Sequence, residues 1–124
     1  MSTVRLSHTK HVNVVGVTFV DTYPHNLIAL RDAEADAEAR GERLTVVLVR
    51  NPANPHDVNA VEIHIPALGE MAMIGHLARD VAAKVAPRMD AGDRFACEVS
   101  WVRINPDHLD RPGIDVAIAR VLPD

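Results

Sequence analysis

Short apolar stretches rich in Val and Ile, separated by polar turns, recur along the chain. AVEIHI alternates between apolar and polar positions, which is typical of a strand with one face in water. LTVVLVR is almost wholly apolar and favours a buried strand. Together these patterns predict six strands, over residues 12–19, 44–50, 60–65, 71–77, 95–104 and 114–122.

Two further stretches predict helices. Residues 26–40, NLIALRDAEADAEAR, are rich in the strong helix formers Ala and Glu, and Gly41 is suited to end the helix. Residues 78–86, ARDVAAKVA, form the second candidate. We expect Pro87 to end or kink this second helix, because proline has no N–H to donate.

The order of these elements defines the expected fold class. A β-α-β-β-β-α-β-β order leaves little room for a parallel sheet built from β-α-β units. The 124 residues favour a single domain over residues 1–124. We therefore predict a mostly β, α+β fold: a small six-stranded antiparallel β-barrel with two helices.

Negative charge is concentrated in one segment. The net charge is −4, and residues 32–42 carry five acids and one base, which accounts for all of it. This balance argues against generic nucleic-acid binding, and a broad phosphate-neutralising face is not evident. The segment could be a lengthened helix against the barrel or an acidic arm for a protein partner. We favour a solvated surface helix.

The sequence indicates a cytoplasmic protein. No apolar run approaches the roughly 20 residues that span a membrane, and the N-terminal residues 1–19 lack a signal-peptide core. Cys97 is the only cysteine, which excludes an internal disulfide framework and a cysteine-based zinc site. It lies in an apolar run, so we interpret it as a small core residue.

Motifs of enzyme chemistry are missing. The sequence contains no GxxxxGK[ST], GxGxxG or GxSxG pattern, and we expect no catalytic activity and no cofactor. Four side chains could in principle gather a metal: His56, Asp57, His64 and His76. A nuclease-like carboxylate set is a further alternative, formed by Asp57 with Glu62 and Glu98.

The loop NPANPHDVNA, residues 51–60, joins two predicted strands. Pro52 and Pro55 fix their φ angles near about −65° and restrict the residues before them. Asn and Asp side chains in such loops bond to nearby backbone in Asx turns. The loop would present His56 and Asp57 at its tip, either as a well-made turn or as part of a binding site.

A second cluster lies in IGHLARD, residues 74–80. His76 and Arg79 are three residues apart at the predicted helix start, which would place them on one face. Free backbone N–H groups and the positive end of the helix dipole make such a position suitable for one phosphate. The alternative is that His76 caps the helix and Arg79 is solvated.

At these motifs the chain resembles the HIRAN domain family, which is named for DNA-repair helicase-like ATPases. The resemblance rests on VVGVTF, LVRNPANPHDVNAVEIHI and IGHLARDVAAKVAPRMDAG, and covers Val14 to Val121. It implies a compact OB-like barrel with two helices that binds single-stranded DNA, in the best-studied members at a free 3′ end. The sequence contains no ATPase segment, so we expect a stand-alone form.

The resemblance also implies a set of DNA-binding positions: Thr18, Phe19, Asn54, His56, Asp57, His76 and Arg79. Asn54 and Asp57 match the DNA-end pocket, where an acid can accept a bond from the 3′-hydroxyl. His56 stands where an aromatic side chain often stacks on the terminal base.

The remaining matched positions concern phosphate and stacking. His76 matches the family histidine, and Arg79 matches a basic residue near phosphate. Phe19 matches an aromatic position, whereas Thr18 replaces a basic residue and removes one phosphate contact. Aromatic residues make up only 3% of the chain, so the stacking surface is thin.

We therefore predict a non-catalytic binding module for single-stranded DNA or a DNA 3′ end, with no membrane partner. A helicase or nuclease could be the protein partner that supplies catalysis. The alternative function is a protein-interaction or regulatory module that kept the fold without DNA affinity. A metal-dependent nuclease is a third reading, and the sequence leaves open whether DNA or RNA is bound.

Overall fold

Six strands and two α-helices make up the part of the chain that the computed structural model describes, which is residues 6–15, 23–69, 73–105, 107 and 113–122. The strands are β1 (Lys10–Val15), β2 (Thr45–Arg50), β3 (Val61–His64), β4 (Met73–Leu77), β5 (Phe95–Arg103) and β6 (Gly113–Arg120). The helices are α1 (Tyr23–Ala39) and α2 (Arg79–Asp90), and a short 3-10 helix, η1 (Pro66–Leu68), follows β3. All eight predicted elements are present, although positions 16–19 of the first predicted strand and 71–72 of the fourth lie outside the described residues.

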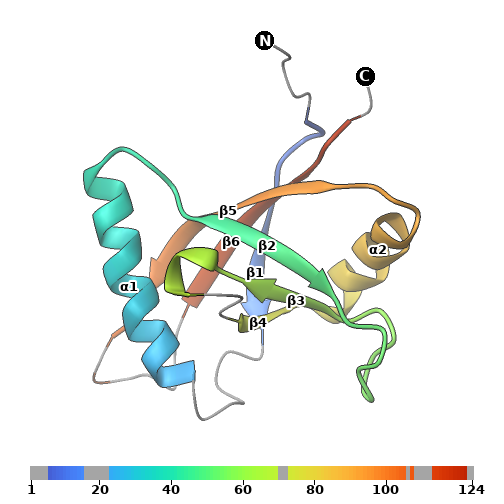
Figure 1. The fold of residues 1–124 in the computed structure, drawn as a ribbon, viewed down its shortest axis with the longest axis horizontal. Helices are drawn as coiled ribbons and strands as arrows, with labels where there is room; N and C mark the ends of the chain where they lie inside the picture. The colour runs from blue at the N-terminus through green and yellow to red at the C-terminus, as the bar shows by residue number, and fades with distance from the viewer. Residues whose placement is uncertain (1–5, 16–22, 70–72, 106, 108–112, 123–124) are drawn as a thin grey trace.

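The strands close into a barrel in the order β1-β4-β3-β2-β5-β6, with β6 pairing back to β1 (Figure 1). Every neighbouring pair is antiparallel. The register shifts between Ile63 and His64 in β3 and between Val99 and Trp101 in β5. The predicted fold class, a mostly β six-stranded antiparallel barrel with two helices, is confirmed.

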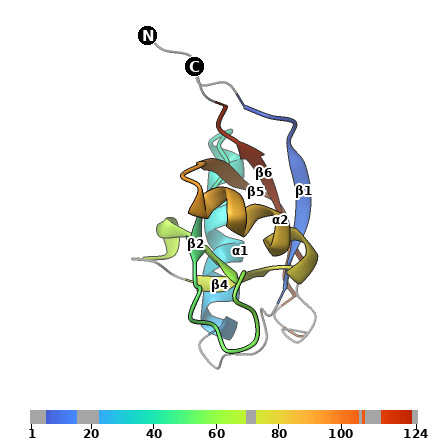
Figure 2. The same ribbon diagram turned by 90° about the vertical axis from the view of Figure 1, so that its right-hand side faces the viewer.

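The two α-helices lie at opposite sides of the barrel (Figure 1), with α1 against η1, β5 and β4 and α2 against β3. Figure 2 looks at the barrel from the α2 side and shows loop 51–60 beside this helix. None of the helices in the described ranges is long and apolar enough to cross a membrane.

The core is built from alternate strand positions and one face of each α-helix. The largest fully buried side chains are Leu27, Leu30, Val61, Ile63, Ile65, Ile74, Val99 and Val116. Burying one such side chain contributes about 1.5–3 kcal/mol relative to leaving it in water. These residues therefore fix the barrel and hold α1 on its side.

The acidic segment 32–42 lies mostly within α1, which packs against the barrel rather than standing free in water. Leu27, Leu30 and Ala37 are buried and Ala33 packs partly against the core, so one face is covered. The expectation of a solvated helix holds only for its outer face. The buried face of α1 could not be predicted from the regular Ala spacing, because alanine can lie at a buried or an exposed position equally well.

Helix α2 continues to Asp90, so of the two outcomes expected for Pro87, an end or a kink, the end is wrong. Pro87 and Ala83 are both on the exposed side of the helix. Only the bond from position 87 to the Ala83 carbonyl is lost, and water can reach that carbonyl. The carbonyl of Pro87 accepts a bond from Ala91 N at 3.1 Å, so the helix runs on past the proline.

Candidate nucleic-acid interface

Loop 51–60 between β2 and β3 is held by the side chains of its own Asn and Asp residues. Asn54 Oδ1 accepts bonds from the backbone N–H of His56 at 2.8 Å and of Asp57 at 3.2 Å. Asp57 Oδ1 accepts from Asn59 N at 2.9 Å. The predicted Asx turns are therefore confirmed, and they leave the His56 side chain exposed.

Arg79, at the start of α2, joins this loop to the helix. Its guanidinium donates to the backbone carbonyl of His56, and its Nε lies 3.8 Å from Asp57 Oδ2. The side chain of Arg79 is 75% exposed and that of Asp57 21% exposed. We call the group Asn54, His56, Asp57 and Arg79 the loop–α2 junction. It places an anionic acceptor and a cationic donor side by side at the surface.

His76 lies in strand β4 and not at the start of a helix, so the helical-spacing argument that paired it with Arg79 is wrong. The strand continues through Leu77 because β4 pairs with β1 and β3 up to its last residues. His76 is opposite Val15 on one side and Glu62 on the other, and it is half-buried. The first turn of α2 begins after Ala78, whose side chain makes no capping bond.

Glu62, next to His76 in the sheet, is already engaged on both oxygens. Its Oε2 accepts from Asn51 Nδ2 at 3.0 Å and its Oε1 lies 2.9 Å from Nε2 of His64, which is buried. Glu98 lies on β5, which β2 separates from β3. Among the described residues no three His, Cys, Asp or Glu side chains are placed to hold a metal ion. The structure therefore does not gather the carboxylates or histidines of the metal and nuclease alternatives.

Thr18 and Phe19 lie outside the described residues, so the structure gives them no position. Cys97 lies on β5 and packs partly against the core, as the sequence predicted. Burial raises the pKa of its thiol from the usual 9.0 to about 12. At neutral pH this thiol is protonated and a poor nucleophile.

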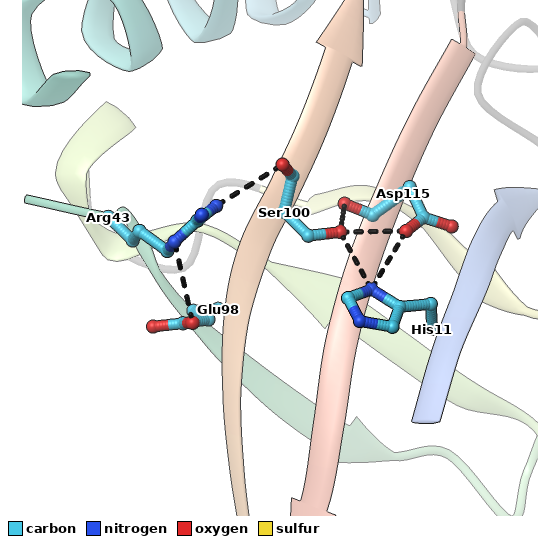
Figure 3. A network of polar contacts seen from close by, with 5 residues as sticks. All are labelled: His11, Arg43, Glu98, Ser100 and Asp115. Carbon is cyan, nitrogen blue, oxygen red and sulfur yellow. Dashed lines mark hydrogen bonds and ion pairs between the residues drawn. The ribbon is translucent and has the colours of Figure 1, made fainter. Parts of the chain in front are cut away.

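A polar network on the outer face of β1, β5 and β6 was not predicted from the sequence (Figure 3). His11 Nδ1 lies 3.3 Å from both Ser100 Oγ and Asp115 Oδ2, and Ser100 Oγ donates to Asp115 Oδ2 at 2.7 Å. A hydrolase triad needs the serine and the acid on different imidazole nitrogens. Here both meet the same nitrogen, so the network ties three strands together and is not a nucleophile with its base.

Trp101 is an exposed aromatic side chain that the sequence reasoning did not single out. It is 49% exposed, and the guanidinium carbon of Arg103 lies 5.7 Å from the centre of its ring. A Cβ built on Gly113 would lie 2.9 Å from Cζ3 of Trp101, so the close approach of this ring requires glycine. Trp101 lines a hollow with Glu34 and Glu38 of α1. The loop–α2 junction is at the α2 side, opposite α1 (Figure 1), so the two are separate surfaces.

The described residues form a closed six-stranded barrel in which a polar loop is joined to the start of a helix. The family model described as the HIRAN domain matches residues 9–111. The chain therefore belongs to the HIRAN domain family, a family of DNA-binding modules rather than catalytic domains. The comparison with curated proteins found no match.

Two solved structures share the fold. The HIRAN domain of human HLTF is 18% identical, with a TM-score of 0.61, over 93% of this chain and 76% of that chain. A protein from Lactobacillus plantarum is 23% identical, with a TM-score of 0.68, over 98% of both chains. At these identities the likeness establishes the fold.

Proposed function

We propose that this chain, as one domain over residues 1–124, is a non-catalytic module that binds single-stranded DNA and holds a free 3′ end at the loop–α2 junction. The observation that carries the proposal is the pair of Asp57 and Arg79, a carboxylate and a guanidinium 3.8 Å apart at the surface. The carboxylate would accept a bond from a 3′-hydroxyl. The guanidinium would turn to the adjacent phosphate, since arginine recognises phosphate well.

Membership of the HIRAN family supports this assignment of roles. Asn54 would keep the loop in shape through its two backbone bonds. His56, whose side chain is exposed, would stack on the terminal base, although an imidazole offers a smaller face than the usual aromatic ring. His76 would add a charge near the phosphate when it is protonated.

The proposal is tested by fluorescence anisotropy with labelled single strands that end in a 3′-hydroxyl or a 3′-phosphate. A terminal phosphate would place its charge against Asp57, and like charges in contact strongly disfavour binding. We expect the 3′-hydroxyl strand to bind at least about tenfold more tightly. Equal affinities would remove the claim of end recognition, and no binding at low salt would remove the claim of DNA binding.

A charge-neutral variant sharpens this test. Asp57→Asn keeps an oxygen that can accept the bond from Asn59 N but removes the negative charge. We expect it to reduce the preference for the 3′-hydroxyl end. Asp32→Asn is the matched control, because it makes the same charge change on α1, at the opposite side of the barrel. A control variant that lost the preference equally would contradict the assignment of Asp57.

A further inference from the structure

A groove runs between α2 and strands β1 and β6, and it is lined by residues other than those of the loop–α2 junction. Its volume is about 280 Å³. Small-molecule pockets usually enclose about 300–1,000 Å³. The α2–β6 groove therefore suits one or two side chains of a peptide better than a whole cofactor.

The rim of the α2–β6 groove is basic. Four cationic side chains line it: Lys10, Lys84, Arg88 and Arg120. Lys10 and Arg120 come from two paired strands at the end of the barrel, while Lys84 and Arg88 are one turn apart on α2. Among the described residues no acidic side chain lines this groove.

Two of these cations have no acidic partner within the described part of the chain. No ion pair joins Lys10 or Lys84 to any described carboxylate, whereas Arg88 and Arg120 share Asp93 at 3.7 and 3.5 Å. Asp93 thus holds two guanidinium groups at one end of the groove. The positive charge of the two lysines remains available to a ligand.

The floor of the groove is apolar. Val81 and Val85 of α2 and Ile118 of β6 are buried, and Phe95 packs partly against the core. Lys10 and Arg120 occupy the next inward-facing positions after Val12 and Ile118, where the barrel interior opens to water. Lys10 and Arg120 therefore border the apolar floor because β1 and β6 extend beyond their last core residues, while Lys84 and Arg88 border it from exposed positions of α2.

We infer that the α2–β6 groove binds a peptide segment of a partner protein in which apolar side chains are flanked by Asp or Glu residues. The apolar side chain would cover the part of the floor that is still exposed. The flanking carboxylates would pair with Lys10 and Lys84. Charge complementarity of this kind mainly supplies specificity and association rate.

Nucleic acid fits this groove less well than an acidic peptide. A phosphodiester would use the cations but leave the apolar floor without a partner. The ring of Phe95 packs against the core, so it is not free to stack on bases. A second copy of this chain fits poorly as well, because its acidic segment 32–42 carries no apolar side chain larger than alanine.

The test uses a fluorescent synthetic peptide in which Asp and Glu alternate with Phe and Leu, measured by anisotropy at low and physiological salt without DNA. Lys84→Glu and Lys10→Glu each reverse one exposed charge on opposite walls of the groove. We expect each to weaken peptide binding roughly fivefold or more. Arg40→Glu, in the turn directly after α1, is the matched control with the same change in net charge, and we expect it to leave peptide affinity unchanged.

Two control peptides test the contributions of the apolar floor and of the cationic rim separately. Replacing Phe and Leu by Ala, or Asp and Glu by Lys, should each abolish binding. The inference is overturned if the acidic peptide does not bind at low salt, or if the lysine reversals weaken it no more than Arg40→Glu does. It is also overturned if the reversals weaken single-stranded DNA binding instead, which would assign the groove to nucleic acid. Because no DNA is present in the peptide assay, failure of the proposed DNA function leaves this result unaffected.

Discussion

Asn54 stabilises loop 51–60 with a single side-chain oxygen that accepts two backbone N–H groups. Replacing it by alanine leaves both donors to water. We expect Asn54→Ala to lower the free energy of unfolding by about 1 kcal/mol, because the bonds are partly exposed and a net hydrogen bond contributes about that much. Urea denaturation followed by circular dichroism measures the change.

Asn54→Asp is the control for this position. Its carboxylate oxygen can accept the same two bonds, so we expect stability close to that of the parent chain. If both variants lose the same stability, the amide nitrogen of Asn54 matters and the turn is not held by its oxygen alone.

Cys97 gives the chain a specific response to high pH. Burial raises its pKa to about 12, so between about 9 and 12 the unfolded chain loses a proton that the folded chain keeps. Cys97 therefore adds no pH dependence below 9, and folding stability falls as the pH rises from 9 towards 12. We expect this fall to be smaller in Cys97→Ala, measured by urea denaturation at pH 8 and 10. An identical fall in both proteins would mean that Cys97 titrates normally.

Polar contacts can be predicted from the sequence when the two residues lie close together along the chain. The bonds of Asn54 and Asp57 join atoms two or three residues apart, so the local pattern NPANPHDVNA is enough to expect them. His11 meets Ser100 and Asp115 across 89 and 104 residues, and only the pairing of three strands brings them together. No local pattern could indicate that network.

At the scale of elements, Pro87 lies inside α2 and removes one backbone bond. Alanine there would restore the donor to the Ala83 carbonyl, and part of the gain would be offset because the unfolded chain becomes more flexible. We expect Pro87→Ala to raise the free energy of unfolding by about 1–2 kcal/mol, measured by thermal or urea denaturation.

Pro66 provides the matched comparison for this substitution. It is exposed at the first position of η1, where its missing N–H has no helical partner. We therefore expect no gain from Pro66→Ala. If Pro87→Ala destabilised the protein, contacts of the proline ring would outweigh the lost bond.

The elements themselves were predictable because hydrophobic periodicity is local, but their relations to one another were not. The pairing of β4 with β1 and β3 confirms the predicted strand through His76, and this strand is incompatible with the helical face assumed for His76 and Arg79. Likewise, Ala-rich α1 has a buried face only because the barrel lies beside it. The basic rim of the α2–β6 groove exists because β1, β6 and α2 come together in the fold. The net charge of the chain could not predict it.

In the whole molecule, the loop–α2 junction and the α2–β6 groove carry different cations. The salt dependence of DNA affinity can show which of these cations contact DNA. Arg79 and protonated His76 are the cations assigned to DNA. They imply about one to two neutralised phosphates and a slope of log affinity against log salt near about −0.7 to −1.4 for single strands. Anisotropy titrations at several salt concentrations give this slope. A slope steeper than about −3 would show that the cations of the α2–β6 groove also contact DNA.

The closed order of the strands has a consequence for how partners attach. Each of β1 to β6 has a hydrogen-bonded neighbour on both sides, so none of the described strands is a free edge along its whole length. A partner strand therefore cannot pair along the full length of any of these strands, and full-length edge-to-edge aggregation is blocked in the same way. We therefore expect partners to be recognised mainly by side chains on the outer faces, so the order of side chains in a bound peptide should matter more than its backbone conformation.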